Sequence, residues 1–100
     1  MKIYSDEQIV SRTSGFVFKE MANESILIEL VNNVVNMDKV ITLNELGTFI
    51  YNQLQESKNI KQLVLAITSE FEIDIETATK DLNEFIAHAI SSKILEIGKV

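Results

Sequence analysis

Residues Ile41 to Leu54 read ITLNELGTFIYNQL, and within this segment the chain changes character. Before Asn44, short β-prone runs alternate with turn residues, which is the pattern of strands. Asn44 itself suits the start of a helix, because its side chain can accept a hydrogen bond from a free N–H of the first turn. Apolar residues then recur at helical spacing, namely Leu46, Phe49, Ile50 and Leu54. The segment therefore predicts a sheet before Asn44 and helices after it.

Three strands are predicted on the N-terminal side, at Phe16–Met21, Ser25–Val31 and Lys39–Leu43. Turn residues separate the first two strands at 22–24. Asn32 and Asn33 follow the second strand, and Asn tolerates the left-handed conformation that tight turns need. The stretch just before Lys39 reads either as a loop or as an irregular strand start. Short turns favour antiparallel pairing of the strands.

Three helices are predicted on the C-terminal side, with Asn44, Asn59 and Asp74 as their N-caps. The apolar stripe of the second helix is Ile60, Leu63, Val64, Ile67 and Phe71. That of the third is Ala78, Leu82, Phe85, Ile86, Ala89 and Ile90. The apolar residues of 94–97 are expected to fold back onto the sheet.

Strands followed by helices predict an α+β fold, with a three-stranded antiparallel sheet followed by a three-helix bundle. The length suits one domain over residues 1–100, with an N-terminal arm at 1–15, the sheet at 16–43 and the helical part at 44–95. A sheet of three strands leaves two edges, and an open edge offers unpaired N–H and C=O groups. Such an edge is the first indication of function.

Composition disfavours several classes of protein. The net charge is −6 and the nine basic residues are scattered, so nucleic acid is not expected as a partner. The chain has no Cys, which rules out disulfides, thiolate metal sites and a Cys nucleophile. No apolar run approaches the roughly 20 residues that span a membrane. Asp6 and Glu7 stand where a signal peptide would be apolar, so we expect a cytoplasmic protein.

The residue types that enzymes use for catalysis do not form a recognisable set in this sequence. His88 is the only histidine and has no second histidine at metal-binding spacing. Acids alternate from Glu70 to Glu76, but the Gly turn and the final Glu of a calcium loop are missing. Neither a nucleophile elbow nor a Gly-rich phosphate loop occurs. We therefore expect no enzyme activity, no cofactor and no metal site.

The ordered set of motifs from Phe16 to Leu95 resembles the PqqD family. The strand-to-helix segment carries the likeness at Leu43, Asn44, Glu45, Gly47, Phe49 and Ile50. The last helix carries it at Asp81, Leu82, Phe85, Ile86 and Ala89. Three positions depart from the family pattern: Tyr51 replaces a frequent Trp, Ala89 a larger residue and Lys93 a Gly. The Pro-Glu-Gly segment of the quinone-cofactor pathway is missing near Leu30–Val35, which favours a related peptide-maturation pathway.

The resemblance implies a winged-helix-like fold that binds the leader of a ribosomally synthesised precursor peptide (RiPP). In the family the leader adds as a strand along the third strand and lies in a groove against the last helix. The domain then docks on a modifying enzyme, often a radical S-adenosylmethionine (radical SAM) protein. The residues expected to bind peptide here are Lys39, Val40, Ile41, Thr42, Leu43, Ala78, Asp81, Phe85, His88 and Ala89.

Two other functions fit the same fold. A winged-helix DNA-binding regulator would read DNA with the last helix, but Glu76, Asp81 and Glu84 outnumber Lys80 there and would repel phosphate. A plain dimerisation module would pair two copies through the third strand, giving a homodimer through the sheet edge.

Overall fold

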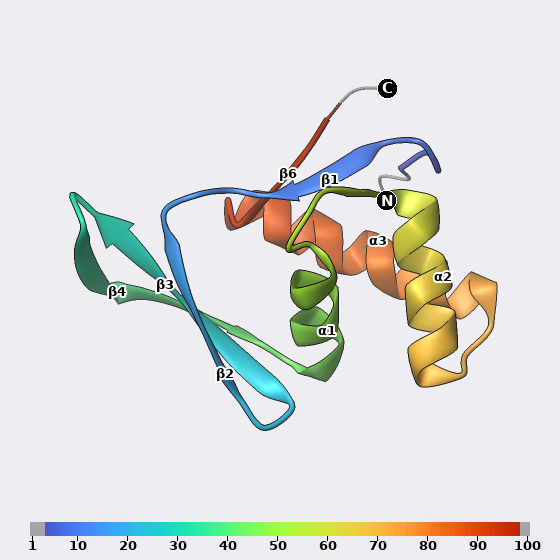
Figure 1. Ribbon diagram of the computed structural model, residues 1–100, viewed down its shortest axis with the longest axis horizontal. Helices are drawn as coiled ribbons and strands as arrows, with labels where there is room; N and C mark the ends of the chain where they lie inside the picture. The colour runs from blue at the N-terminus through green and yellow to red at the C-terminus, as the bar shows by residue number, and fades with distance from the viewer. Residues whose placement is uncertain (1–3, 99–100) are drawn as a thin grey trace.

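The computed structural model describes residues 4–98, which form two small sheets and three helices (Figure 1). The elements in chain order are β1 (Ile9–Arg12), β2 (Phe16–Met21), β3 (Glu24–Val31), β4 (Val34–Leu43), α1 (Glu45–Gln53), β5 (Lys58–Asn59), α2 (Ile60–Phe71), α3 (Ile75–Ser91) and β6 (Leu95–Ile97). The predicted α+β class, with an antiparallel three-stranded sheet followed by three helices, is confirmed.

The main sheet has the order β2-β3-β4, and both pairs are antiparallel. Asn32 and Asn33 are both left-handed, with φ of 51° and 64°, so they form a two-residue turn that pairs Val31 with Val34. The stretch before Lys39 is therefore strand and not loop. The irregularity lies within the strand and not at its start, because the register shifts between Glu29, which pairs with Asn36, and Ile28, which pairs with Val40.

Local hydrogen bonds start each helix at the predicted cap. The side chain of Asn44 accepts from the N–H of Gly47 at 2.9 Å, and Asp74 accepts from the N–H of Thr77 at 2.8 Å. Asn59 forms a complete capping box with Gln62. The hydrogen bonds from Thr77 lower the pKa of Asp74 below its ordinary value.

The core lies between the inner face of the main sheet and the helices. Leu27 of β3 and Leu82 and Ile86 of α3 are fully buried in it. A buried hydrogen bond of 2.7 Å joins the hydroxyls of Ser25 in β3 and Thr48 in α1. Sheet and first helix are thus held together by a polar contact as well as by apolar packing.

A second small sheet, of order β5-β1-β6, was not predicted. The supposed N-terminal arm supplies its central strand β1, which pairs with Lys58–Asn59 on one side and with Leu95–Ile97 on the other. The apolar C-terminal stretch therefore pairs with β1 instead of folding onto the main sheet. Within residues 4–98, no helix is long and apolar enough to cross a membrane.

Candidate functional site

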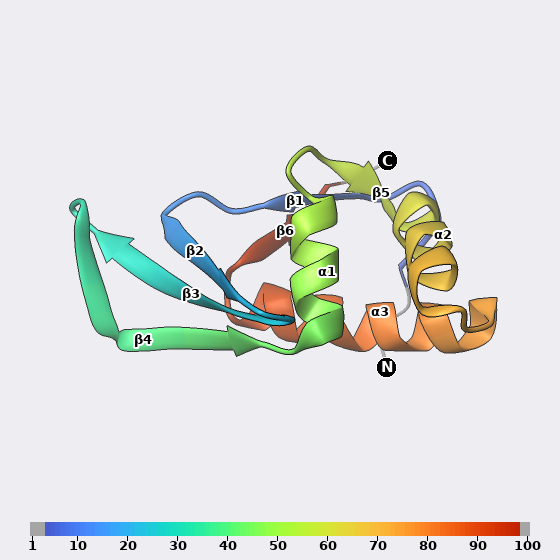
Figure 2. The same cartoon turned by 60° about the horizontal axis from the view of Figure 1, so that its bottom comes forward.

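The outer edge of β4 is open along the described part of the chain. β4 pairs with β3 on one side, and no other strand of residues 4–98 pairs with it. The N-terminal strand β1 pairs only with β5 and β6, so it does not cover this edge. Figure 2 shows β4 running along the border of its sheet toward α1.

One hydrogen bond shows which residues of β3 direct their backbone groups toward β2 and which direct them toward β4. The N–H of Leu30 donates to the carbonyl of Gly15 at 2.8 Å, on the side of β2. In an antiparallel ladder, hydrogen-bonding direction alternates from residue to residue. The register between β2 and β3 is unbroken. Ser25 and Leu27, at odd steps from Leu30, therefore direct their backbone groups toward β4.

The free groups of β4 follow from this assignment. Leu27 pairs with Ile41 and Ser25 pairs with Leu43, so those two residues of β4 bond inward. Val40 and Thr42 alternate with them and direct their N–H and C=O groups away from the sheet. Val40 and Thr42 lie two positions apart, which is the spacing at which an edge strand forms hydrogen bonds with an added extended chain.

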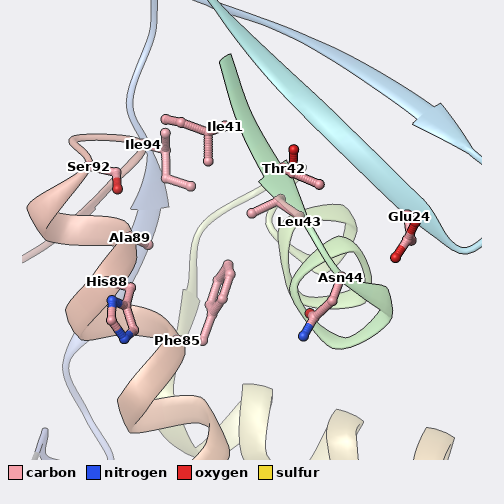
Figure 3. Close-up of a pocket in the computed structure, with 10 residues that line it drawn as sticks. All are labelled: Glu24, Ile41, Thr42, Leu43, Asn44, Phe85, His88, Ala89, Ser92 and Ile94. Carbon is pink, nitrogen blue, oxygen red and sulfur yellow. The ribbon is translucent and has the colours of Figure 1, made fainter. Parts of the chain in front are cut away.

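A hollow of about 410 Å³, called the groove below, lies between the end of β4 and α3 (Figure 3). Phe85, His88 and Ala89 come from α3 and face the β4 side across it. Its lining is Glu24, Ile41, Thr42, Leu43, Asn44, Phe85, His88, Ala89, Ser92 and Ile94. Much of this wall is apolar, so the groove would bury aliphatic side chains next to the open backbone edge.

A second hollow of about 370 Å³, the side pocket, adjoins the groove. Asn44, Phe85 and His88 line both spaces. The remaining residues of the side pocket are Leu46, Gly47, Asp81 and Glu84. Its rim is therefore more acidic than the groove.

The structure gathers most of the predicted binding residues at this place. Ile41, Thr42, Leu43, Phe85, His88 and Ala89 line the groove, and Asp81 lines the side pocket. Lys39 and Val40 continue the same strand, where Lys39 Nζ lies 3.5 Å from a carboxylate oxygen of Glu29. Ala78 lines neither the groove nor the side pocket and is fully buried.

Ile94 is a wall residue that the sequence interpretation did not include. It follows Lys93, which takes the left-handed conformation at φ 66°. The N–H of Ile94 then donates to the carbonyl of Ala89 at 3.0 Å, which closes the helix end and seats Ile94 in the wall. The apolar stretch of 94–97 indicated a buried segment, but the position of Ile94 in the wall depends on the turn at Lys93.

The groove offers backbone hydrogen bonds and apolar contact more than acid–base chemistry. Among residues 4–98, His, Asp and Glu do not gather in threes as metal ligands would.

Residues 24–95 match the family described as coenzyme PQQ synthesis protein D (PqqD). The chain belongs to the PqqD family. The matched segment runs from β3 to β6, so it includes the open edge and α3. This PqqD-family chain is also similar to a solved structure described as TbiB1 in complex with the TbiA(beta) leader peptide. The TM-score is 0.72 and the identity 24%, over 90% of this chain and 98% of TbiB1, which shows a shared fold. No curated protein matches the chain.

Proposed function

We propose that this PqqD-family protein binds the leader of a ribosomally synthesised precursor peptide, which adds as a strand to β4. The observation that carries the proposal is the open edge at Val40 and Thr42, next to the groove. Strand addition takes affinity from main-chain hydrogen bonds and selectivity from pockets for alternate side chains. Both features occur side by side here.

The energetics of this mode are reasonable for a functional complex. Ordering an extended peptide costs about 2–5 kcal/mol. Two or three aliphatic side chains buried in the groove would each return about 1.5–3 kcal/mol, and the strand hydrogen bonds add to that. We expect these gains to offset the ordering cost, and micromolar to submicromolar affinity is the hypothesis that the titration below tests. Asp81, in the acidic side pocket, would attract a basic residue of the leader.

The similar structure supports leader binding, since it is described as a protein of this fold in complex with a leader peptide. Family membership supports it independently. We propose that the protein itself does no chemistry and acts in the cytoplasm by presenting the bound peptide to a separate modifying enzyme. A radical SAM protein is the enzyme class we propose for this partner.

The test is an NMR titration of the ¹⁵N-labelled protein with synthetic leader peptides. The probes are the N-terminal halves of the short peptides encoded beside the gene, with the TbiA(beta) leader for comparison. Amide shifts should concentrate in residues 39–43 and in α3. Shifts centred on α2, or none with any peptide, would contradict the proposal.

Two further measurements separate the competing partners. Sedimentation with and without peptide distinguishes a leader carrier from a dimer that uses the β4 edge for itself, because that dimer would persist and ignore the peptide. Co-purification with any radical SAM enzyme found to be encoded beside the gene, with and without leader, tests the presenting role. An enzyme that never associates would restrict the function to peptide binding.

A further inference from the structure

The ring of Phe85 stands where the groove and the side pocket meet. It comes from α3, lines both spaces and points toward the β4 side of the groove (Figure 3). It is partly buried and packs against the core. The ring therefore forms a shared wall between the two spaces.

Gly47 of α1 is the residue on which this wall depends. A Cβ added at Gly47 would come within 2.8 Å of Phe85 Cε1. Real carbon pairs approach to about 3.5–4.0 Å, so the ring occupies space that any other residue at this position would fill. The missing side chain of Gly47 thus sets where the Phe85 ring lies.

We propose that Phe85 is a specificity-determining residue and Gly47 its positioning residue, which together divide the peptide site into two compartments. This inference rests on the proposed function. One compartment is apolar and bounded by Leu43, Ala89 and Ile94, which are 5%, 2% and 1% exposed. The other is the side pocket. The leader is then recognised through two of its side chains, which point into the site on either side of the Phe85 ring.

The substrate class follows from the walls. Alternate residues of an extended peptide, i and i+2, point to the same side and lie roughly 7 Å apart. The buried walls of the apolar compartment cannot recede easily, and the ring closes it toward the side pocket. It therefore favours aliphatic side chains, such as Leu, Ile, Val or Met.

Gly47→Ala tests the wall without endangering the fold. The atom that it would meet is the far end of a side chain, so the ring moves and the backbone does not have to. Gly47 lies inside α1, where Ala is the better helix former. We expect stability equal to or above that of the wild type, together with a changed choice of peptide.

The experiment is selection of a ribosome-displayed library of random 12-residue peptides against the immobilised full chain. The wild type should enrich a medium aliphatic residue at one position. Gly47→Ala should shift that preference to smaller residues by at least tenfold in enrichment, because the displaced ring narrows the compartment. Phe85→Leu should shift the preference toward larger side chains, because it removes the ring, and adding it to Gly47→Ala should reverse the shift to smaller residues.

Phe71→Leu is the matched control, since it removes a partly buried aromatic ring that touches neither space. If the wild type and both variants enrich peptides with the same preference within twofold, the compartment inference is wrong while peptide binding stands. If the wild type enriches no peptide, the proposed function fails and the inference with it. Changed chemical shifts of the Phe85 ring protons in peptide-free Gly47→Ala report the ring movement directly.

Discussion

Arg12 lies over the ring of Tyr51 and is hydrogen-bonded to the Tyr51 backbone at the same time. The guanidinium carbon of Arg12 is 3.9 Å from the centre of the Tyr51 ring. Its Nη2 and Nε donate to the Tyr51 carbonyl at 2.6 Å and 3.1 Å. Because Arg12 belongs to β1 and Tyr51 to α1, this contact fastens the small sheet to the first helix.

Replacing Arg12 should loosen this junction. Arg12→Ala removes a cation–π contact and two hydrogen bonds to a helix-end carbonyl, and we expect the free energy of unfolding to fall by about 1–2 kcal/mol. Arg12→Lys should recover only part of the loss, because an ammonium cannot make the paired bonds. Urea denaturation followed by circular dichroism measures both. Lys61→Ala, at an exposed position of α2, is the control; a loss there equal to that of Arg12→Ala would contradict the assignment.

The Tyr51 hydroxyl should make stability depend on pH in the alkaline range. Burial raises the pKa of Tyr51 above its ordinary value of 10.0, while the charge of Arg12 lowers it. The folded state then holds this proton more tightly than the unfolded chain. The resulting stability is complete below pH 10.0 and is lost as the pH rises through the folded pKa. The free energy of unfolding should therefore fall more steeply above pH 10.0 in the wild type than in Tyr51→Phe.

The same titration tests the neighbouring charge. Removing Arg12 should raise the pKa of Tyr51 further, which tyrosinate absorbance measures. The chain has two tyrosines, so Tyr4→Phe leaves a single reporting group. An unchanged or lower pKa in Arg12→Ala would show that the charge of Arg12 does not act on the hydroxyl.

A proline on the open edge should block peptide binding and spare the sheet. Thr42→Pro removes an outward N–H and leaves the hydrogen bonds to β3 in place. Losing one strand hydrogen bond and crowding the edge should weaken leader affinity about tenfold or more, measured by calorimetry. Glu20→Pro is the matched control, because by the same alternation Glu20 faces outward on the opposite edge, β2. Equal losses in both variants would mean that the peptide does not use β4.

The buried hydroxyl pair tests how β3 holds α1. Ser25→Ala leaves the Thr48 hydroxyl with only a long hydrogen bond of 3.4 Å to the Leu43 carbonyl, and should cost about 1–2 kcal/mol of unfolding free energy. Thr48→Val should cost a similar amount. The double variant should lose clearly less than the two single losses added together, since neither partner is then left unpaired. Strict additivity in urea unfolding would show that the two hydroxyls do not interact energetically.

Local chemistry determined much of this protein from its sequence. Asn44, Asn59 and Asp74 cap helices through bonds to residues three positions on, and Asn32 and Asn33 turn the chain within two residues. Interactions of this range are visible in the sequence because both partners lie in one short segment. The motifs shared with the family also indicated the edge strand and the last helix as the elements of interest, and the structure places these two elements beside each other.

Only the tertiary structure decided the small sheet and the detail of the site. Val10 pairs with Lys58, and Arg12 pairs with Leu95, through strands of two to four residues. Such strands are too short to show a period, and their partners are distant in the chain, so the sequence carries no local sign of them. The burial of Ala78 and the contact of Phe85 with Gly47 likewise depend on how α3 is rotated against its neighbours. That rotation is set by packing of the whole core and not by any single segment.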